Sequence, residues 1–186
     1  MSLSITDLKK GAVFQLDGAP YRVLEYSHKV MGRGSSSVSL KIKNLIDGKV
    51  LDKTFRGKEN IDSADIASRP VQYLYTQAGL AYFMDSDNFE QFSLSQTRPA
   101  SQTDFLKEGD TVTGLFFNDR LINIELPKNL PLKVALTENA VRGDTSTAVT
   151  KNATVETGLV VKVPAFIKSG DIISVDTTTG TYRARV

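Results

Sequence analysis

Residues 39–48 read Ser39-Leu40-Lys41-Ile42-Lys43-Asn44-Leu45-Ile46-Asp47-Gly48, and this stretch decides the fold class. Polar and apolar side chains alternate over residues 39–45, which is the pattern of a β-strand with one buried and one solvated face. The Asp-Gly pair that follows is a strong signal for a hairpin turn. Lys41 and Lys43 fall on the polar side of this pattern, so we expect both to face solvent.

The same combination of a short apolar run and turn residues recurs along the whole chain, and Asn118-Asp119 predicts a further hairpin turn. The other runs that we expect to form strands are residues 12–16, 21–26, 72–75, 80–84, 111–117, 121–126, 158–163 and 172–175. Helix signals are few: residues 101–104 resemble a capping box that opens a short helix ended by Gly109, and residues 62–68 fit one helical turn. Many short strands at regular spacing predict an all-β protein made of small barrels or sandwiches.

Proline and polar residues interrupt the strand pattern near residues 61–70 and again near residues 127–131. These interruptions predict three domains, residues 1–64, 65–127 and 128–186. Domains of this size have marginal cores, so we expect the first two to pack against each other. A weak internal echo supports three β units, because each contains a glycine that opens a strand leading to a hairpin turn: Gly11, Gly109 and Gly170.

The net charge of +2 is unevenly distributed. Residues 1–60 hold 11 Lys and Arg against 6 Asp and Glu, residues 61–126 hold 4 against 10, and residues 127–186 hold 8 against 5. Charge of alternating sign favours two segments suited to polyanions and one that repels them or faces a basic protein. A nucleic acid contacted by both ends of the chain fits this distribution.

The side chains needed for most kinds of catalysis are missing. The chain has no cysteine and a single histidine, His28, so the sequence offers no metal site, no disulfide and no thiolate. Glycine-rich phosphate-binding motifs are also absent. We therefore expect a protein that is not an enzyme and needs no cofactor. Without a long apolar run, a secretory signal or cysteine, we expect a cytoplasmic protein with no membrane partner.

The connection between the strands at 21–26 and 38–45 contains Met31, Gly32, Arg33, Gly34 and Ser35. Glycines allow the positive φ angles of a tight loop and leave the residue between them unshielded. A guanidinium is permanently charged, and it forks onto phosphates and stacks on bases. From the residues alone, Arg33 is either an ordinary solvated turn residue or a side chain delivered to a distant partner.

A long motif in the last third of the chain makes the interpretation specific. It reads Lys151-x-Ala153, four residues, then Gly158-x-x-Val161-x-Val163-Pro164-x-x-Ile167-x-x-Gly170. This motif resembles the signature of bacterial elongation factor P at every fixed position. Further segments resemble the same family and extend the resemblance over essentially the whole chain: 41–45, 53–55, 83–84, 89–91, 142–145, 175–177, 180–182 and Arg185.

The resemblance implies a fold and a function that periodicity alone does not give. It implies an SH3-like (KOW-type) N-terminal barrel and two OB-fold barrels, arranged in an L that mimics a tRNA. It also implies a monomeric translation factor that binds the ribosome between the peptidyl and exit sites, near ribosomal RNA and proteins. There, the factor promotes peptide-bond formation at stalled polyproline stretches by positioning the reactants.

The resemblance also assigns the tip loop. When the chain is aligned on residues 41–45, the tip position of the family falls on Arg33, which would reach the CCA end of the peptidyl-tRNA. Most members carry a lysine there that is often extended by a covalent modification. In an arginine branch, which this chain resembles better, a dedicated rhamnosyltransferase modifies the tip arginine. Met31 stands where the lysine branch usually has proline, and Gly34 with the three serines after it differs from the Asn-containing loop of the rhamnosylated branch. A rhamnosylated and an unmodified Arg33 therefore both remain open.

Further RNA contacts are expected on both basic segments. Exposed cations neutralise phosphates and make the affinity salt-dependent, although Lys41 and Lys43 also fit a merely solvated strand face. The predicted RNA-contacting residues are His28, Lys29, Lys41, Lys43, Arg142, Gly143, Asp144, Thr145, Tyr182, Arg183 and Arg185.

Two alternatives stay open. One is a paralogue with different stalling substrates. The other is a general single-stranded RNA-binding OB protein, which the acidic middle segment disfavours because such proteins need basic grooves.

Overall fold

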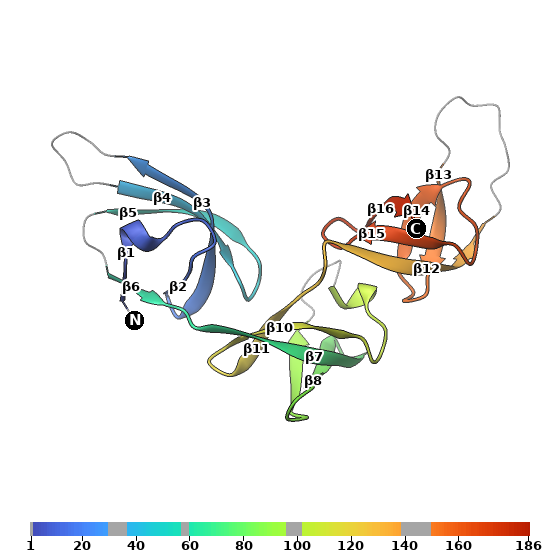
Figure 1. Cartoon of the computed structure of the whole chain (residues 1–186), viewed down its shortest axis with the longest axis horizontal. Coiled ribbons are helices and arrows are strands. Elements are labelled where there is room, and N and C mark those ends of the chain that lie inside the picture. The colour runs from blue at the N-terminus through green and yellow to red at the C-terminus, as the bar shows by residue number, and fades with distance from the viewer. Residues whose placement is uncertain (1, 30–36, 57–59, 96–101, 139–149) are drawn as a thin grey trace. The chain divides into compact units, whose positions relative to one another are not determined.

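The computed structural model describes residues 2–29, 37–56, 60–95, 102–138 and 150–186 of the chain. The described chain is nearly all β and forms three sheets, with two short 3-10 helices (Figure 1). The all-β prediction is therefore confirmed. The elements are β1 Ser2–Ser4, η1 Ile5–Asp7, β2 Val13–Leu16, β3 Ala19–Lys29, β4 Ser37–Asn44, β5 Val50–Arg56, β6 Asn60–Ser63, β7 Ile66–Gln77, β8 Leu80–Asp85, β9 Gln91–Ser95, η2 Gln102–Phe105, β10 Thr111–Phe117, β11 Arg120–Glu125, β12 Asn129–Thr137, β13 Thr150–Val155, β14 Val160–Pro164, β15 Ile172–Asp176 and β16 Thr181–Arg185.

The chain divides into two compact units. The first comprises residues 1–69 and 114–123, and the second comprises residues 70–113 and 124–186. The tip of the β10–β11 hairpin belongs to the first unit because its apolar side chains pack around Leu45. The three domain boundaries expected from the sequence remain a prediction.

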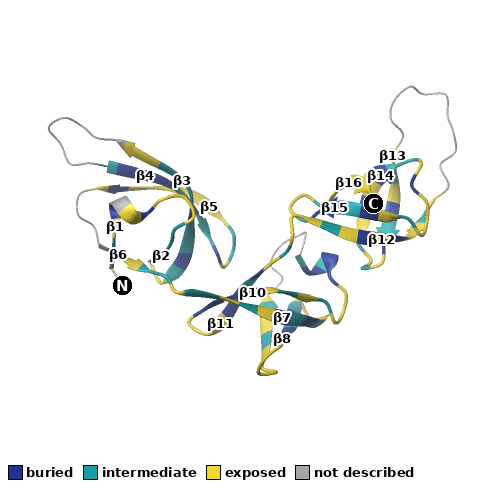
Figure 2. Ribbon diagram, viewed as in Figure 1, coloured by how far each residue is buried: buried dark blue, intermediate teal, exposed yellow. Residues whose placement is uncertain are grey.

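The first sheet has the strand order β1-β6-β2-β3-β4-β5. Its longest pairing joins β3 to β4, from Tyr21 opposite Asn44 to Lys29 opposite Ser37. The alternation expected from the sequence is present, since Val38, Leu40 and Ile42 of β4 are buried and the residues between them are less so (Figure 2). These three side chains belong to a single core with Phe14 and other apolar groups.

The second and third sheets share one topology. Their strand orders are β11-β10-β7-β8-β9 and β16-β15-β12-β13-β14. In each sheet the first strand along the chain is central, the next two strands lie on one side of it, and the last two lie on the other side. The hairpin turn expected at Asn118 and Asp119 is present, and both residues have positive φ, as such turns require.

One backbone clamp occurs in all three sheets. A glycine N–H donates to the carbonyl of a strand residue, whose own N–H donates to the carbonyl of the residue after the glycine. A β-bulge follows in that strand each time. The three glycines have φ between 90° and 92°, which explains why glycine stands there. The clamps join Gly11 and Ala12 to Val23, Gly109 and Asp110 to Tyr73, and Gly170 and Asp171 to Val134.

The helical turn expected over residues 62–68 was wrong. The segment lies in β6 and the start of β7, and Asp62 is opposite Ser2 of β1 and Gln15 of β2. Pairing with strands far away in the sequence overrides the weak local preference. The second helix signal is realised only as the 3-10 turn η2. Its expected cap, Ser101, lies outside the described residues, and Gly109 forms the clamp after the turn.

The interruption expected at residues 127–131 does not stop a strand, because β12 contains Pro131. Thr177 N donates to Lys128 O at 2.9 Å, so in this antiparallel pair the even-numbered residues of β12 exchange hydrogen bonds with β15. The position of Pro131 therefore needs no N–H toward β15. Pairing with β13 begins only at Val134, so the missing donor is tolerated on the other side as well.

Within the second unit, Phe105 of η2 is buried in the same core cluster as the side chains of β12 to β15, and it is only 4% exposed. Nearby, the Lys107 Nζ and Glu156 Oε2 atoms form an ion pair at 3.2 Å. The pKa of Glu156 lies below its usual value, chiefly because the Lys133 N–H donates to it and also because of Lys107. These contacts hold η2 and Lys107 against the C-terminal sheet.

Candidate functional site

The strands β3 and β4 flank the segment that holds the predicted tip. Their last pair is Lys29 opposite Ser37, so the hairpin is paired up to the edge of that segment. The predicted tip residues Met31, Gly32, Arg33, Gly34 and Ser35 lie outside the described residues. Their assignment therefore remains a prediction.

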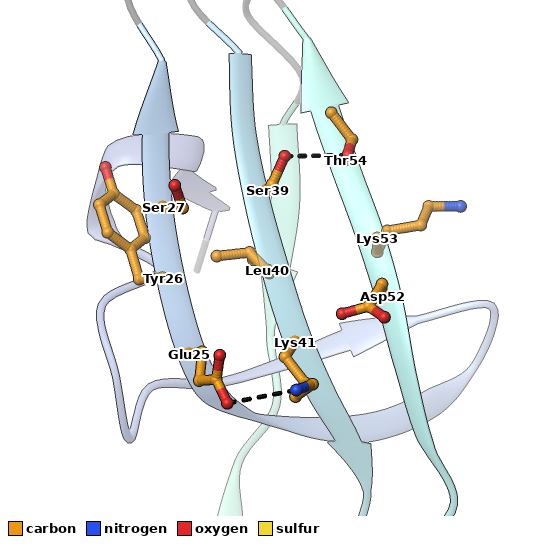
Figure 3. A pocket seen from close by; sticks show the side chains of 9 residues that line it. All are labelled: Glu25, Tyr26, Ser27, Ser39, Leu40, Lys41, Asp52, Lys53 and Thr54. Carbon is orange, nitrogen blue, oxygen red and sulfur yellow. Dashed lines mark hydrogen bonds and ion pairs between the residues drawn. The ribbon is translucent and has the colours of Figure 1, made fainter.

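The outer face of β3, β4 and β5 consists of cross-strand rows, because residues directly opposite each other share a face. From one end to the other these rows are Arg22–Lys43–Val50, Glu25–Lys41–Asp52 and Ser27–Ser39–Thr54. Figure 3 shows the middle of this face, where the side chains border a groove of about 200 Å³. Lys41 and Lys43 thus lie on the polar face, as predicted.

Charge on this face is partly neutralised. The Lys41 Nζ atom lies 3.3 Å from Glu25 Oε1, and Asp52 lies opposite Lys41 on β5 (Figure 3). The row that holds Lys43 contains Arg22 and no carboxylate. Glu25 was not among the residues expected at this site, because its place beside Lys41 depends on strand register.

His28 lies on the opposite face of the same hairpin. Its cross-strand partner is Val38, which is fully buried, and its ring centroid lies 6.4 Å from that of Tyr26. The bulge between Val23 and Glu25 shifts the alternation of β3 by one residue, which puts His28 on this side. The structure therefore does not bring His28 together with Lys41. Lys29 holds the last register position of β3.

Three of the predicted C-terminal contacts, Tyr182, Arg183 and Arg185, lie on β16, and the two arginines pair with carboxylates. Arg183 Nη2 lies 2.6 Å from Oδ2 of the buried Asp176. This guanidinium, followed by the N–H groups of Thr178 and Thr179, holds the pKa of Asp176 at about 2. These contacts give Arg183 a structural role in the β15–β16 turn.

The neighbouring residues differ in how they are held. Arg185 Nη1 lies 4.0 Å from Asp171 Oδ2, a looser pair, and Tyr182 packs against the C-terminal core. Arg142, Gly143, Asp144 and Thr145 lie outside the described residues. RNA contact by any of these residues stays a prediction.

In the described part of the chain, no group of three or more histidine or carboxylate side chains is placed to hold a metal ion. None of its helices has the length and apolar character needed to cross a membrane.

Three family models match consecutive parts of the chain. Residues 4–61 match the elongation factor P KOW-like domain, residues 66–124 match the elongation factor P OB domain, and residues 130–185 match the elongation factor P C-terminal domain. The matches correspond to the KOW and OB folds expected from the resemblance.

Curated relatives and solved structures agree with these models. The chain is 41% identical over 183 residues to elongation factor P of Moorella thermoacetica, covering 98% of this chain and 99% of that one. It is 42% identical to elongation factor P of Dictyoglomus thermophilum over the same shares of both chains.

Among solved structures, a Methanococcus jannaschii protein titled eukaryotic translation initiation factor 5A matches with a TM-score of 0.56 at 16% identity. That match covers 67% of this chain and 92% of the other, and it supports the fold alone. The family models and the relatives together cover nearly the whole sequence. The chain therefore belongs to the elongation factor P family of translation factors.

Proposed function

We propose that this chain binds the ribosome between the peptidyl and exit sites and promotes peptide-bond formation at stalled polyproline stretches. Arg33 is the tip residue that reaches the CCA end of the peptidyl-tRNA. The observation that carries this proposal is the match to elongation factor P along the whole chain, at about 40% identity. A protein acting in this way works in the cytoplasm as a monomer and supplies no reactive group of its own.

The β3–β4 hairpin supports the proposed role of Arg33. β3 spans 11 residues, or about 35 Å of extended chain at ~3.3 Å per residue. Eight register pairs join β3 to β4, and the segment with Arg33 connects their ends. A paired hairpin gives a single cation a defined base from which to contact a reactant. Holding the peptidyl-tRNA in a reactive geometry lowers the entropic part of the barrier without acid–base chemistry.

The described cations support contacts with RNA to different degrees. Lys43 shares its row with Arg22 and has no carboxylate opposite, so we propose it as a phosphate contact. Lys41 must give up part of its pairing with Glu25 to make such a contact. We also propose Arg185 as an RNA contact in preference to Arg183, because the pairing of Arg183 with buried Asp176 is the shorter of the two.

The modification state of Arg33 needs a direct measurement. An arginine rhamnosyltransferase is the proposed modifying partner, and unmodified Arg33 is the competing state. Intact-mass measurement of protein purified from its native host decides between them. A deoxyhexose addition that disappears in Arg33→Lys supports rhamnosylation, and a mass equal to that of the bare chain rejects it.

The function itself is tested by peptide synthesis through a run of three prolines on purified bacterial ribosomes. Native protein is expected to restore synthesis, and Arg33→Ala is expected to lose most of that effect. Lys10→Ala, which removes an exposed cation elsewhere in the same barrel, should behave like the unsubstituted chain. A proline-free template should respond to none of them. No rescue by any form would reject the proposal in favour of a paralogue or a general RNA-binding protein.

A further inference from the structure

The middle row of the outer face of the first sheet holds two carboxylates and one ammonium. Glu25 of β3, Lys41 of β4 and Asp52 of β5 are cross-strand neighbours, and Figure 3 shows the Lys41 side chain between the other two. The Lys41 Nζ atom lies 3.3 Å from Glu25 Oε1. Because one carboxylate is enough to pair with one ammonium, the row carries a net negative charge.

Strand register brings the second carboxylate close to Lys41 as well. Asn44 N donates to Lys49 O at 2.9 Å, so these two residues form a hydrogen-bonded pair at the end of the β4–β5 ladder. Hydrogen-bonded and non-hydrogen-bonded pairs alternate along antiparallel strands, which makes Lys41 and Asp52 a non-hydrogen-bonded pair. Side chains approach most closely in such pairs. Asp52 therefore adds its negative charge beside the ammonium that Glu25 already contacts.

These carboxylates stand out against the charge of the surrounding segment. Residues 1–60 hold 11 Lys and Arg against 6 Asp and Glu, and two of those six lie in this one row. The row on one side contains Arg22 and Lys43, and the row on the other side carries only hydroxyl side chains. The two carboxylates thus interrupt a face that would otherwise be basic.

The ion pair in this row stays accessible to a ligand. The side chain of Lys41 is 40% exposed and that of Glu25 is 71% exposed. Ion pairs in contact with water are weak, because solvent and salt screen them. A phosphate that approaches the face can therefore replace Glu25 at Lys41, but it must also overcome the repulsion of Asp52. The row weakens the binding of RNA without preventing it.

We propose that Glu25 and Asp52 restrict which RNA the first sheet holds, by competing with phosphates for Lys41. The inference rests on the function proposed above, in which cations of this face contact RNA. An RNA that touches only this face has few contacts, so the competition releases it. The ribosome keeps its contacts with other parts of the chain and remains bound. Repulsion of this kind is a common way to suppress wrong partners.

Two structural roles for the same carboxylates make different predictions. A cross-strand ion pair can serve the stability of the sheet alone. Charges on β5, which is the last strand in the order of the first sheet, can keep its edge from pairing with another chain. Neither role changes the affinity for RNA, so the tests measure that affinity directly.

The first test titrates a short RNA duplex of arbitrary sequence with the full chain at several salt concentrations. We expect Glu25→Gln and Asp52→Asn each to strengthen binding about threefold or more, because a phosphate then meets less competition at Lys41. With both replaced, the slope of log affinity against log salt should become steeper by about one. The matched control is Asp17→Asn, which removes an exposed carboxylate from the β2–β3 turn at a φ of 51° that asparagine also adopts. This control should leave the affinity nearly unchanged.

Adding Lys41→Ala shows whether the carboxylates act through Lys41. The gain from Glu25→Gln should disappear in the Lys41→Ala background, as a double-mutant cycle detects. A gain that persists there, or an equal gain from Asp17→Asn, would reduce the effect to net charge and refute the inference. Unchanged binding of Glu25→Gln would refute it as well, because the carboxylates would then serve the fold alone.

The second test connects the competition to the proposed function. Synthesis through a run of three prolines is measured on purified bacterial ribosomes with an excess of the same duplex. The unsubstituted chain should keep its effect, and the chain with both Glu25→Gln and Asp52→Asn should lose most of it, because the duplex captures it. Equal inhibition of both chains would refute the inference. If the unsubstituted chain restores no synthesis even without the duplex, the proposed function fails, and the duplex titrations still decide whether the two carboxylates compete for Lys41.

Discussion

Replacing Phe105 by alanine tests whether η2 belongs to the core of the C-terminal sheet. The Phe105 side chain is 96% removed from solvent, since only 4% of its surface is exposed. A phenylalanine buries about 200 Å², which at ~25 cal/mol per Å² corresponds to about 5 kcal/mol. Alanine retains about 1 kcal/mol of this. We therefore expect Phe105→Ala to reduce the free energy of unfolding of the second unit by about 4 kcal/mol, within the range seen for buried aromatic groups.

Calorimetry measures the size of this loss, and hydrogen exchange shows where it falls. For a unit of about 100 residues, ~4 kcal/mol lowers the melting temperature by roughly 20 °C. Amide protection should fall in β12 to β15 and persist in β3 and β4, whose core cluster contains no residue of the second unit. The control is Phe166→Ala, because Phe166 belongs to the same unit but is 58% exposed, and it should cost at most about 1 kcal/mol.

Two results would refute this reasoning. If Phe105→Ala cost no more than Phe166→Ala, η2 would not contribute to the C-terminal core in solution. If protection fell equally in β3 and β4, the two units would not be separate cooperative bodies. Either result would contradict the division of the chain drawn from its packing.

Three further predictions concern charged groups. Because Arg183 and two N–H groups lower the pKa of Asp176 from 3.8 to about 2, its stabilising contribution is full above about pH 4 and is lost as the pH falls toward about 2. Melting curves of Arg183→Leu should therefore lose much of the pH dependence that the unsubstituted chain shows in this window. A double-mutant cycle of Lys107→Ala and Glu156→Ala should give a coupling free energy below about 1 kcal/mol, since both side chains are partly exposed, and a larger value would contradict the geometry. Lys43→Ala should reduce the slope of log affinity for ribosomes against log salt by about one, and an unchanged slope would remove Lys43 from the phosphate contacts.

Alternation and turn residues predicted most of the strands. The run expected near residues 38–45 is β4 at Ser37–Asn44, and the Asn-Asp hairpin is where it was expected. Both features depend on neighbouring residues alone. Residues 62–68 show the limit of such reasoning, because their strands exist only through pairing with β1 and β2 from the start of the chain.

The candidate site was predictable only in part, for a specific physical reason. Lys41 and Lys43 share a face because β4 alternates without interruption. His28 lies on the other face because a bulge in β3 changes which residues point inward, and no local sequence signal marked that bulge. Asp176, the buried partner of Arg183, was missed as well. The run Asp176-Thr177-Thr178-Thr179-Gly180 is nevertheless typical of a turn whose aspartate accepts hydrogen bonds from the N–H groups that follow it. Arg33 was assigned by family resemblance alone.

The glycine clamp bears on the ancestry of the chain. In the second and third sheets the clamped strand comes first and its glycine follows the third strand of the sheet, so the two sheets share the clamp and also its place in the strand order. In the first sheet the order is reversed, because Gly11 precedes the strand that holds Val23. The same pair of hydrogen bonds has therefore been reached along a different path through the chain. Comparisons that look for distant homology among such barrels should use strand order, because the clamp also occurs in a sheet with a different order and is therefore no evidence of common descent by itself.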